Sequence, residues 1–268
     1  MFEDLKPHLQ DLRKRLIISV AVLLLSFGVC FNFWGVIFDW VAAPINSALE
    51  NESIKAHLAA LTILENVFVA LKVAFFAALV VSMPIIFWQF WLFVAPGLYK
   101  HEKKIVLPFV AFASVMFACG VGFAYYIVLP VVIENVLLFG SDKFEGSLSA
   151  ENYVMFFTRL VVGFGIAFEL PVLSYFLAKV GMITDKSLKN FFKYAVVIIF
   201  IIAAIITPPD VLSQIFLAIP LVGLYGFSIL IARFVNPAPK ESEQEPQEDE
   251  HDESQESESS APISTQNP

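Results

Sequence analysis

The chain has 268 residues, of which 58% are hydrophobic and 28 are phenylalanine, a composition that excludes an ordinary soluble domain and indicates a polytopic membrane protein. The formal net charge of -8 comes from the C-terminal end of the chain, where residues 241–258 hold ten acids. Residues 1–239 are nearly neutral, with sixteen Lys and Arg against fifteen Asp and Glu. No basic stripe is interleaved with aromatic residues, so we expect no nucleic-acid partner.

Six apolar runs, each bounded by charges or by Pro and Gly, predict six transmembrane helices in an all-α membrane domain over residues 1–235. The last two runs are short, and only the segment from Thr207 to Asp210 separates them, which predicts a tight helical hairpin. Prolines within or beside the runs predict bent helices arranged in a concave body. The predicted spans cover residues 16–38, 67–93, 105–129, 153–179, 191–206 and 211–232.

The distribution of Lys and Arg predicts the orientation of these spans. Thirteen of the 17 basic residues fall at the N-terminus, in the loops after spans two and four, and at the exit from span six, whereas the alternate loops hold only Lys55 and Lys143. Since positive residues stay on the cytoplasmic side, we expect both termini there, with residues 46–60 and 141–151 outside. Residues 236–268 are rich in Pro, Glu, Ser and Gln, so they predict a disordered acidic cytoplasmic tail.

Neither catalysis nor metal binding has a candidate site in the sequence. None of the four histidines lies in a span, no HExxH or GxSxG pattern occurs, and no His, Cys, Asp and Glu cluster has ligand spacing. We therefore expect no enzyme activity, no metal and no cofactor. Cys30 and Cys119 lie inside apolar runs and are interpreted as small hydrophobic residues.

The loop after span two presents one acid at a basic surface. The stretch FVAPGLYKHEKK, residues 93–104, contains a Pro-Gly chain breaker, and a helix that restarts at Leu98 would place Lys100 and Lys104 on one face and Glu102 roughly opposite. From these residues alone, Glu102 either balances charge or binds a ligand.

The amphipathic segment HLQDLRKRL, residues 8–16, leads into span one. Asp11 and Arg15 are four residues apart, which predicts an ion pair that supports the helix. Such an exposed pair contributes only about 0.3–0.5 kcal/mol, so Asp11 is able to exchange Arg15 for another cation.

Four motifs, HLQDLRKRL, FVAPGLYKHEKK, AFELP in span four and TPPDVLSQ between spans five and six, occur in this order. Together with the span count and orientation, they resemble TatC, the polytopic receptor subunit of the twin-arginine protein translocase, over residues 1 to about 235. The resemblance implies a receptor in the bacterial cytoplasmic (inner) membrane. Such a receptor binds signal peptides with two consecutive arginines on folded precursors, and it nucleates their translocation with the proton-motive force.

The resemblance also implies which residues serve the arginine pair. Two acids of the family map onto Asp11 and Glu102, and Asp11 departs from the usual Glu by one methylene. The pairing is physically sensible because the guanidinium fork matches carboxylate oxygens. The predicted signal-peptide site comprises Asp11, Arg13, Arg15, Phe93, Pro96, Leu98, Tyr99, Lys100 and Glu102.

Glu169, in AFELP, is predicted well inside span four, where a charge costs about 2.5–3.5 kcal/mol on insertion scales. Two interpretations stay open: a protonated carboxyl hydrogen-bonded within the bundle, or a polar recess that contacts a partner or a passing precursor. The alternative function for the whole chain, a proton-coupled small-solute transporter, would be centred on Glu169.

Polar residues gather at the outer end of the last hairpin, and Asp210 is predicted to cap the N-terminus of span six. The resemblance implies that this cluster docks small single-span subunits of the TatA/TatB type. We further expect a homo-oligomer within a larger complex. The predicted docking residues are Thr207, Asp210 and Gln214.

Overall fold

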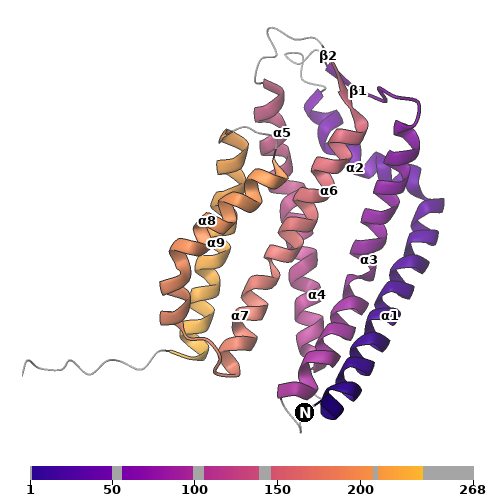
Figure 1. Cartoon of the computed structure of the whole chain (residues 1–268). Helices are drawn as coiled ribbons and strands as arrows, with labels where there is room; N and C mark the ends of the chain where they lie inside the picture. Colours follow the sequence, from indigo (N-terminus) through magenta and orange to yellow (C-terminus); the bar gives the residue numbers. More distant parts are fainter. Residues whose placement is uncertain (1, 50–55, 99–105, 139–145, 208–210, 238–268) are drawn as a thin grey trace, which may run out of the picture. The chain divides into compact units, whose positions relative to one another are not determined.

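The apolar runs form long helices, since a helix satisfies its own backbone hydrogen bonds where no water is present. The computed structural model describes residues 2–49, 56–98, 106–138, 146–207 and 211–237. Within these residues the chain is mostly helical and contains six helices long and apolar enough to cross a membrane (Figure 1). The predicted fold class is therefore confirmed.

The elements of the described part follow one another in this order: α1 (Phe2–Asn32), α2 (Trp34–Leu49), β1 (Ala56–Ala59), α3 (Glu65–Leu98), α4 (Val106–Phe123), a π-helical turn η2 (Ala124–Val128), α5 (Leu129–Leu138), β2 (Gly146–Ser149), α6 (Ala150–Ala167), α7 (Glu169–Lys179), α8 (Asp185–Ile206) and α9 (Val211–Val235). The six spans are Leu9–Asn32, Glu65–Phe93, Leu107–Leu137, Ala150–Lys179, Asp185–Ile206 and Val211–Val235.

The fifth span is longer than its apolar run of residues 191–206. Helix α8 begins at Asp185, and the Oγ1 atom of Thr184 caps it by accepting a hydrogen bond from the N–H of Ser187 at 3.3 Å. The helix has 22 residues, which at about 1.5 Å per residue is enough to cross a bilayer core of about 30 Å. It is still shorter than α3, which has 34 residues.

Two prolines coincide with irregular turns in the long spans. A proline removes one backbone donor and crowds the carbonyl four residues before it. In span three, η2 directly precedes the turn that contains Pro130, and in span four the helix is interrupted at Phe168, shortly before Pro171. Span three is therefore divided into α4, η2 and α5, and span four into α6 and α7.

A short pair of strands, absent from the sequence prediction, joins two segments far apart in the chain. Strand β1 pairs with β2 in parallel, with Ala56 opposite Gly146 and Ala59 opposite Ser149. Each strand has four residues, and β2 runs directly into α6. The pair therefore connects the segment before α3 to the beginning of span four (Figure 1).

The main core lies between α2 and spans two to six, and aromatic side chains tie α2 to spans three and four. The Tyr125 hydroxyl donates to the carbonyl of Trp40 at 2.8 Å, and the two rings stack with centroids 4.2 Å apart. The Tyr153 hydroxyl donates to the carbonyl of Val41 at 2.7 Å. These bonds satisfy buried polar groups, so α2 is fixed against the bundle.

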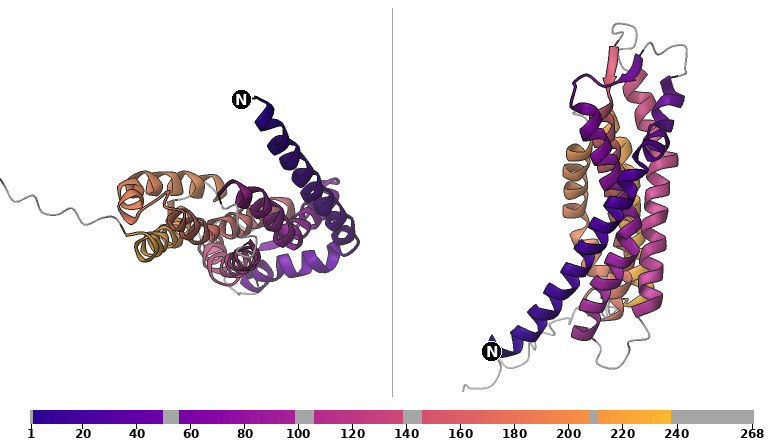
Figure 2. Two further views of the ribbon diagram at one scale, coloured as in Figure 1. Left: turned by 90° about the horizontal axis from the view of Figure 1, so that it is seen from below. Right: turned by 90° about the vertical axis from the view of Figure 1, so that its right-hand side faces the viewer.

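Helix α1 packs along α3, but most of its surface is uncovered. Its span Leu9–Asn32 contains no buried residue, unlike the other five described spans. Figure 2 shows the N-terminal part of α1 diverging from the other helices of the described unit. Most of α1 is thus available to lipid or to another molecule.

Candidate functional site

The N-terminal segment of α1 carries a partly exposed carboxylate, that of Asp11. Arg15 Nε donates to Asp11 Oδ2 at 2.9 Å, which confirms the predicted i,i+4 pair. The Asp11 side chain is 41% exposed, so this pair is screened by solvent and contributes only about 0.3–0.5 kcal/mol. Arg13, one of the predicted site residues, is exposed.

The second predicted segment begins at the same end of the helix pair. Helices α1 and α3 pack together, and the N-terminal end of α1 and the C-terminal end of α3 lie at the same end (Figure 1). Phe93 is partly buried at the end of span two. Pro96 and Leu98 belong to the last turns of α3, whereas Tyr99, Lys100 and Glu102 lie outside the described residues.

The predicted chain break at Pro96-Gly97 is wrong, because α3 continues through these residues to Leu98. A proline removes a single backbone hydrogen bond, and close to the end of a 34-residue helix this loss does not end the helix. The stretch of residues 93–104 therefore starts as a continuation of span two.

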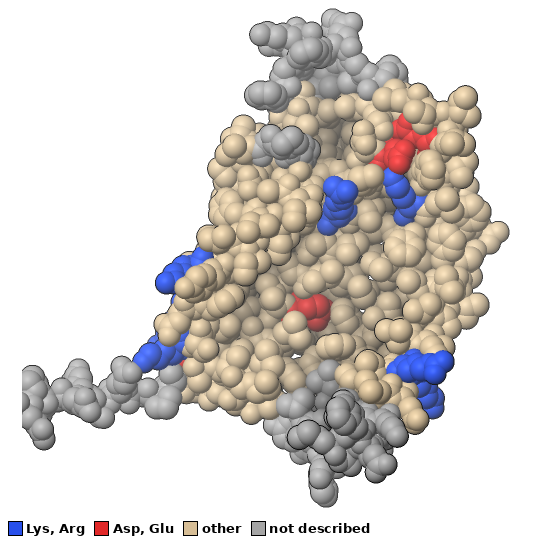
Figure 3. Space-filling model, viewed as in Figure 1, with Lys and Arg blue, Asp and Glu red and all other residues tan. Residues whose placement is uncertain are grey.

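Glu169 is a buried acid at the interruption of span four. It is the first residue of α7, directly after Phe168, and its residue surface is 8% exposed. Its Oε1 atom has no hydrogen-bond partner among the described residues, so the interpretation as a carboxyl hydrogen-bonded within the bundle finds no support there. Figure 3 shows an acidic patch near the middle of the displayed face, with other charged side chains above it, at the lower right and along the left edge.

The polar residues of the last hairpin bind carbonyls of α8. Thr207 Oγ1 donates to the carbonyl of Ala203 at 2.9 Å and is buried, and Gln214 Nε2 donates from α9 to the carbonyl of Phe200 at 3.0 Å. The Gln214 bond joins the beginning of α9 to the last turns of α8, whereas the Thr207 bond closes the end of α8 itself. The predicted capping residue Asp210 lies outside the described residues.

Sequence reasoning missed Glu65, which organises the end of the bundle that carries the strand pair. Its Oε1 atom accepts from the Ser149 hydroxyl at 2.7 Å and from the N–H of Glu151 at 2.9 Å. Its Oε2 atom accepts from the N–H groups of Leu61 and Thr62 at 2.5 and 3.1 Å. Glu65 is 2% exposed, and its hydrogen bonds to Ser149 and Glu151 join the beginnings of spans two and four.

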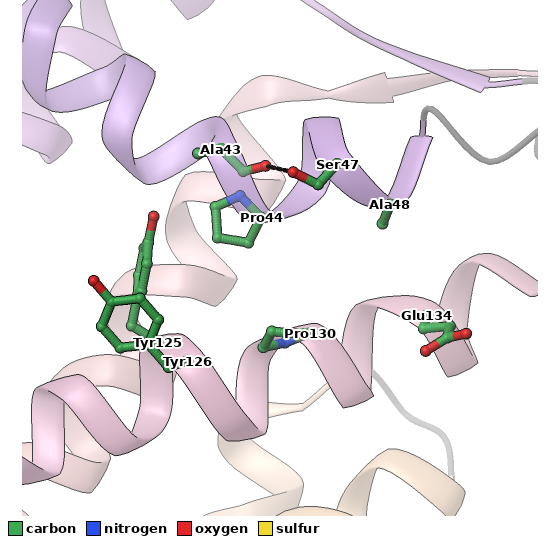
Figure 4. Close-up of a pocket in the computed structure, with 8 residues that line it drawn as sticks. All are labelled: Ala43, Pro44, Ser47, Ala48, Tyr125, Tyr126, Pro130 and Glu134. Atoms are coloured by element: carbon green, nitrogen blue, oxygen red, sulfur yellow. Dashed lines mark hydrogen bonds between the residues drawn. The ribbon is translucent and has the colours of Figure 1, made fainter.

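A pocket of about 470 Å³ opens between α2 and span three. Pro44 of α2 faces Tyr126 and Pro130 across it (Figure 4). The sequence offered two signals, the proline in the segment after span one and the Tyr-Tyr pair ahead of Pro130, but neither indicates a pocket by itself. The lining residues are Ala43, Pro44, Ser47, Ala48, Tyr125, Tyr126, Pro130 and Glu134.

The described residues include no group of three or more His, Cys, Asp and Glu side chains that would hold a metal ion. Carboxylates such as Asp11 and Glu169 are able to form ion pairs and to accept hydrogen bonds. Asp11 has an exchangeable cation beside it, and Glu169 has an oxygen without a donor among the described residues.

Comparison with known proteins gives one consistent result. A family model described as "Sec-independent protein translocase protein (TatC)" matches residues 7–220. The chain is 62% identical over 245 residues to the protein of that name from Helicobacter pylori, covering 91% of this chain and 95% of the relative. It is 50% identical over 246 residues to the one from Campylobacter jejuni, covering 91% and 100%.

A solved structure agrees with these relatives. The crystal structure described as "Twin Arginine Translocase Receptor- TatC" has a TM-score of 0.78 and 39% sequence identity, and the match covers 85% of this chain and 99% of that chain. The fold and the sequence thus point to the same family over the same part of the chain. This chain belongs to the TatC family of Sec-independent protein translocases and is a multi-pass protein of the bacterial inner membrane.

Proposed function

We propose that this chain is the receptor of the twin-arginine translocase and binds signal peptides with two consecutive arginines at the cytoplasmic membrane surface. The observation that carries the proposal is the placement of Asp11. Its carboxylate is 41% exposed, is paired only with its neighbour Arg15 among the described residues, and lies at the same end of the bundle as the start of residues 93–104.

The charges at this end explain why acids are needed. The N-terminal segment and the loop after span two are basic overall, so they repel a cationic peptide at long range. Asp11 and Glu102 act locally: a peptide guanidinium displaces Arg15 from Asp11, and the other arginine pairs with Glu102. Bidentate pairs of guanidinium and carboxylate are stronger than pairs with a lysine ammonium, which favours arginine. Arg13, Phe93, Pro96, Leu98, Tyr99 and Lys100 complete the proposed site.

Translocation requires further contacts, which we assign to two places. Small single-span subunits of the TatA/TatB type dock at the last hairpin, where Gln214 is half-buried and Asp210 follows α8. The buried carboxyl of Glu169 supplies a hydrogen-bonding group to a partner helix or to a passing precursor. The resulting complex contains several copies of this chain and carries folded precursors, with the proton-motive force as the source of energy.

A binding experiment tests the receptor function. The full chain is purified in detergent and titrated with a fluorescent signal peptide that carries consecutive arginines, and with a peptide in which both are lysine. We expect the arginine peptide to bind at least about tenfold more tightly, the ratio for one lost bidentate interaction. Equal binding of the two peptides would contradict a receptor and would favour the transporter centred on Glu169.

A further inference from the structure

A second groove lies between the beginning of span three and the end of span four. It has a volume of about 410 Å³ and is lined by Pro108, Phe109 and Phe112 of α4 and by Tyr175 and Lys179 of α7. Because spans three and four run in opposite directions, the first turn of α4 and the last turn of α7 lie on the same side of the membrane. The Lys and Arg distribution assigns this side to the cytoplasm.

The floor of the groove is a packed aromatic cluster. Phe109 is 8% exposed, and its ring contacts those of Tyr175 and Trp91 with centroids 5.6 and 4.9 Å apart. Phe112, one turn further along α4, is 49% exposed at the rim. The groove thus has a firm apolar floor and an aromatic side chain that an occupant is able to cover.

One end of the groove carries a cation. Lys179 is exposed, and its Nζ atom lies 5.8 Å from the centroid of the Tyr175 ring. Among the described residues no carboxylate forms an ion pair with Lys179, and no acid lines the groove. The complementary occupant is therefore anionic at one end and apolar along the rest of its length.

We propose that this groove binds an anionic phospholipid of the cytoplasmic leaflet. The lipid phosphate lies at Lys179, beside the Tyr175 ring at the membrane interface, and an acyl chain covers Phe112 and Pro108. Aromatic residues and long basic side chains favour this depth in the membrane, and the leaflet itself is anionic. A twin-arginine peptide is a poor occupant by comparison, since its cations would be repelled by Lys179. The proposal is independent of the receptor function.

Native mass spectrometry of the full chain, delipidated in detergent and titrated with phosphatidylglycerol, tests the site. Lys179→Gln is expected to weaken binding of the lipid by about fivefold, the effect of one cation near an anionic surface. Lys179→Arg should retain binding. The matched control is Lys193→Gln: Lys193 of α8 also lies over a tyrosine, 4.9 Å from the Tyr194 centroid, but outside this groove, and its loss should leave the affinity unchanged.

Further arms separate the apolar from the ionic contribution. Phe112→Ala should also weaken binding, whereas phosphatidylcholine, inorganic phosphate and the chain-free headgroup glycerophosphoglycerol should not displace the bound lipid. Thermal melts of each variant verify that the protein is folded. The proposal is overturned if folded Lys179→Gln binds phosphatidylglycerol like the parent, or if inorganic phosphate displaces the lipid. It is equally overturned if Lys179→Gln alters the affinity for a twin-arginine peptide but leaves the affinity for the lipid unchanged.

Discussion

Three carboxylates of this chain differ in the hydrogen-bond donors that surround them. Glu65 accepts four hydrogen bonds while buried, Asp11 shares one exposed ion pair, and Glu169 has an oxygen without a donor among the described residues. A buried acid with all its acceptors used stabilises the fold, whereas an acid with free acceptors is available to another molecule. These environments assign Glu65 a structural role and the other two a proposed functional one.

Replacing Glu65 tests the first assignment. In Glu65→Gln, one carboxylate oxygen becomes an NH₂ group, which cannot accept hydrogen bonds. In one orientation of the amide this group faces the N–H groups of Leu61 and Thr62. In the other orientation it faces the Ser149 hydroxyl and the N–H of Glu151. Leaving these buried donors unpaired should lower the stability by about 1–3 kcal/mol. The measurement is a thermal melt in detergent, with Glu134→Gln as the control because Glu134 is exposed. Equal melting temperatures for both variants would refute the structural role.

Glu169 should respond in the opposite way. Since no described residue donates to its Oε1 atom, Glu169→Gln and Glu169→Ala should keep the melting temperature of the parent. Both variants should still bind a twin-arginine peptide but export a precursor more slowly in cells, because the proposed contact is made after binding. Export and the amount of folded protein are measured together. If the loss of export follows a loss of folded protein, Glu169 is a structural residue.

The partners of these acids were predictable from the sequence only where they lie close together in the chain. The spacing of Asp11 and Arg15 predicted their ion pair, because both residues lie on one helix turn. The role of Glu65 was not predictable, since two of its donors, Ser149 and Glu151, come from a different span. Local pairs follow from spacing, but long-range hydrogen bonds depend on the tertiary fold.

Among the elements, the distance between spans three and four is set by glycine. A Cβ atom on Gly120 of α4 would lie 2.7 Å from the carbonyl oxygen of Phe164 and 3.0 Å from the Cα of Gly165 in α6. Backbones of membrane helices approach this closely only where small residues meet. The contact therefore brings the backbones of α4 and α6 together.

Gly120→Ala should therefore separate the two helices or strain them. We expect a loss of about 1–3 kcal/mol, as for other overpacked positions, measured as a lower melting temperature. Gly122→Ala is the matched control, because it lies in the same helix and a Cβ atom there meets nothing within 4 Å. The close approach would be disproved if Gly120→Ala and Gly122→Ala had the same melting temperature.

The elements were predictable to different degrees. Six helices follow from apolar run length, because each run must cross the membrane with its backbone bonds satisfied. The proline positions indicated bends, yet Pro84 lies in the uninterrupted α3, so a proline alone does not decide where a helix breaks. The strand pair was missed because four residues carry no measurable alternation and their partners are distant in sequence.

For the whole molecule, the first expectation concerns orientation. The distribution of Lys and Arg places the loop of residues 141–151 outside and the beginning of α8 inside. Cysteines introduced at Ser141 and at Ser187, with Cys30 and Cys119 replaced, should react with an impermeant reagent from opposite sides of the membrane. Labelling of both from the same side would contradict the proposed topology, on which the cytoplasmic location of Asp11 rests.

The central claim is that Asp11 and Glu102 hold the arginine pair of a signal peptide. The most direct test is the affinity of one twin-arginine peptide for the parent chain, Asp11→Asn, Glu102→Gln and the double variant. Each lost charge-assisted pair is expected to weaken binding by up to about tenfold. Glu102→Gln should have the larger effect, because Asp11 already has Arg15 as a partner, and both effects should shrink at high salt. A double variant that is folded and binds the peptide like the parent would contradict the claim.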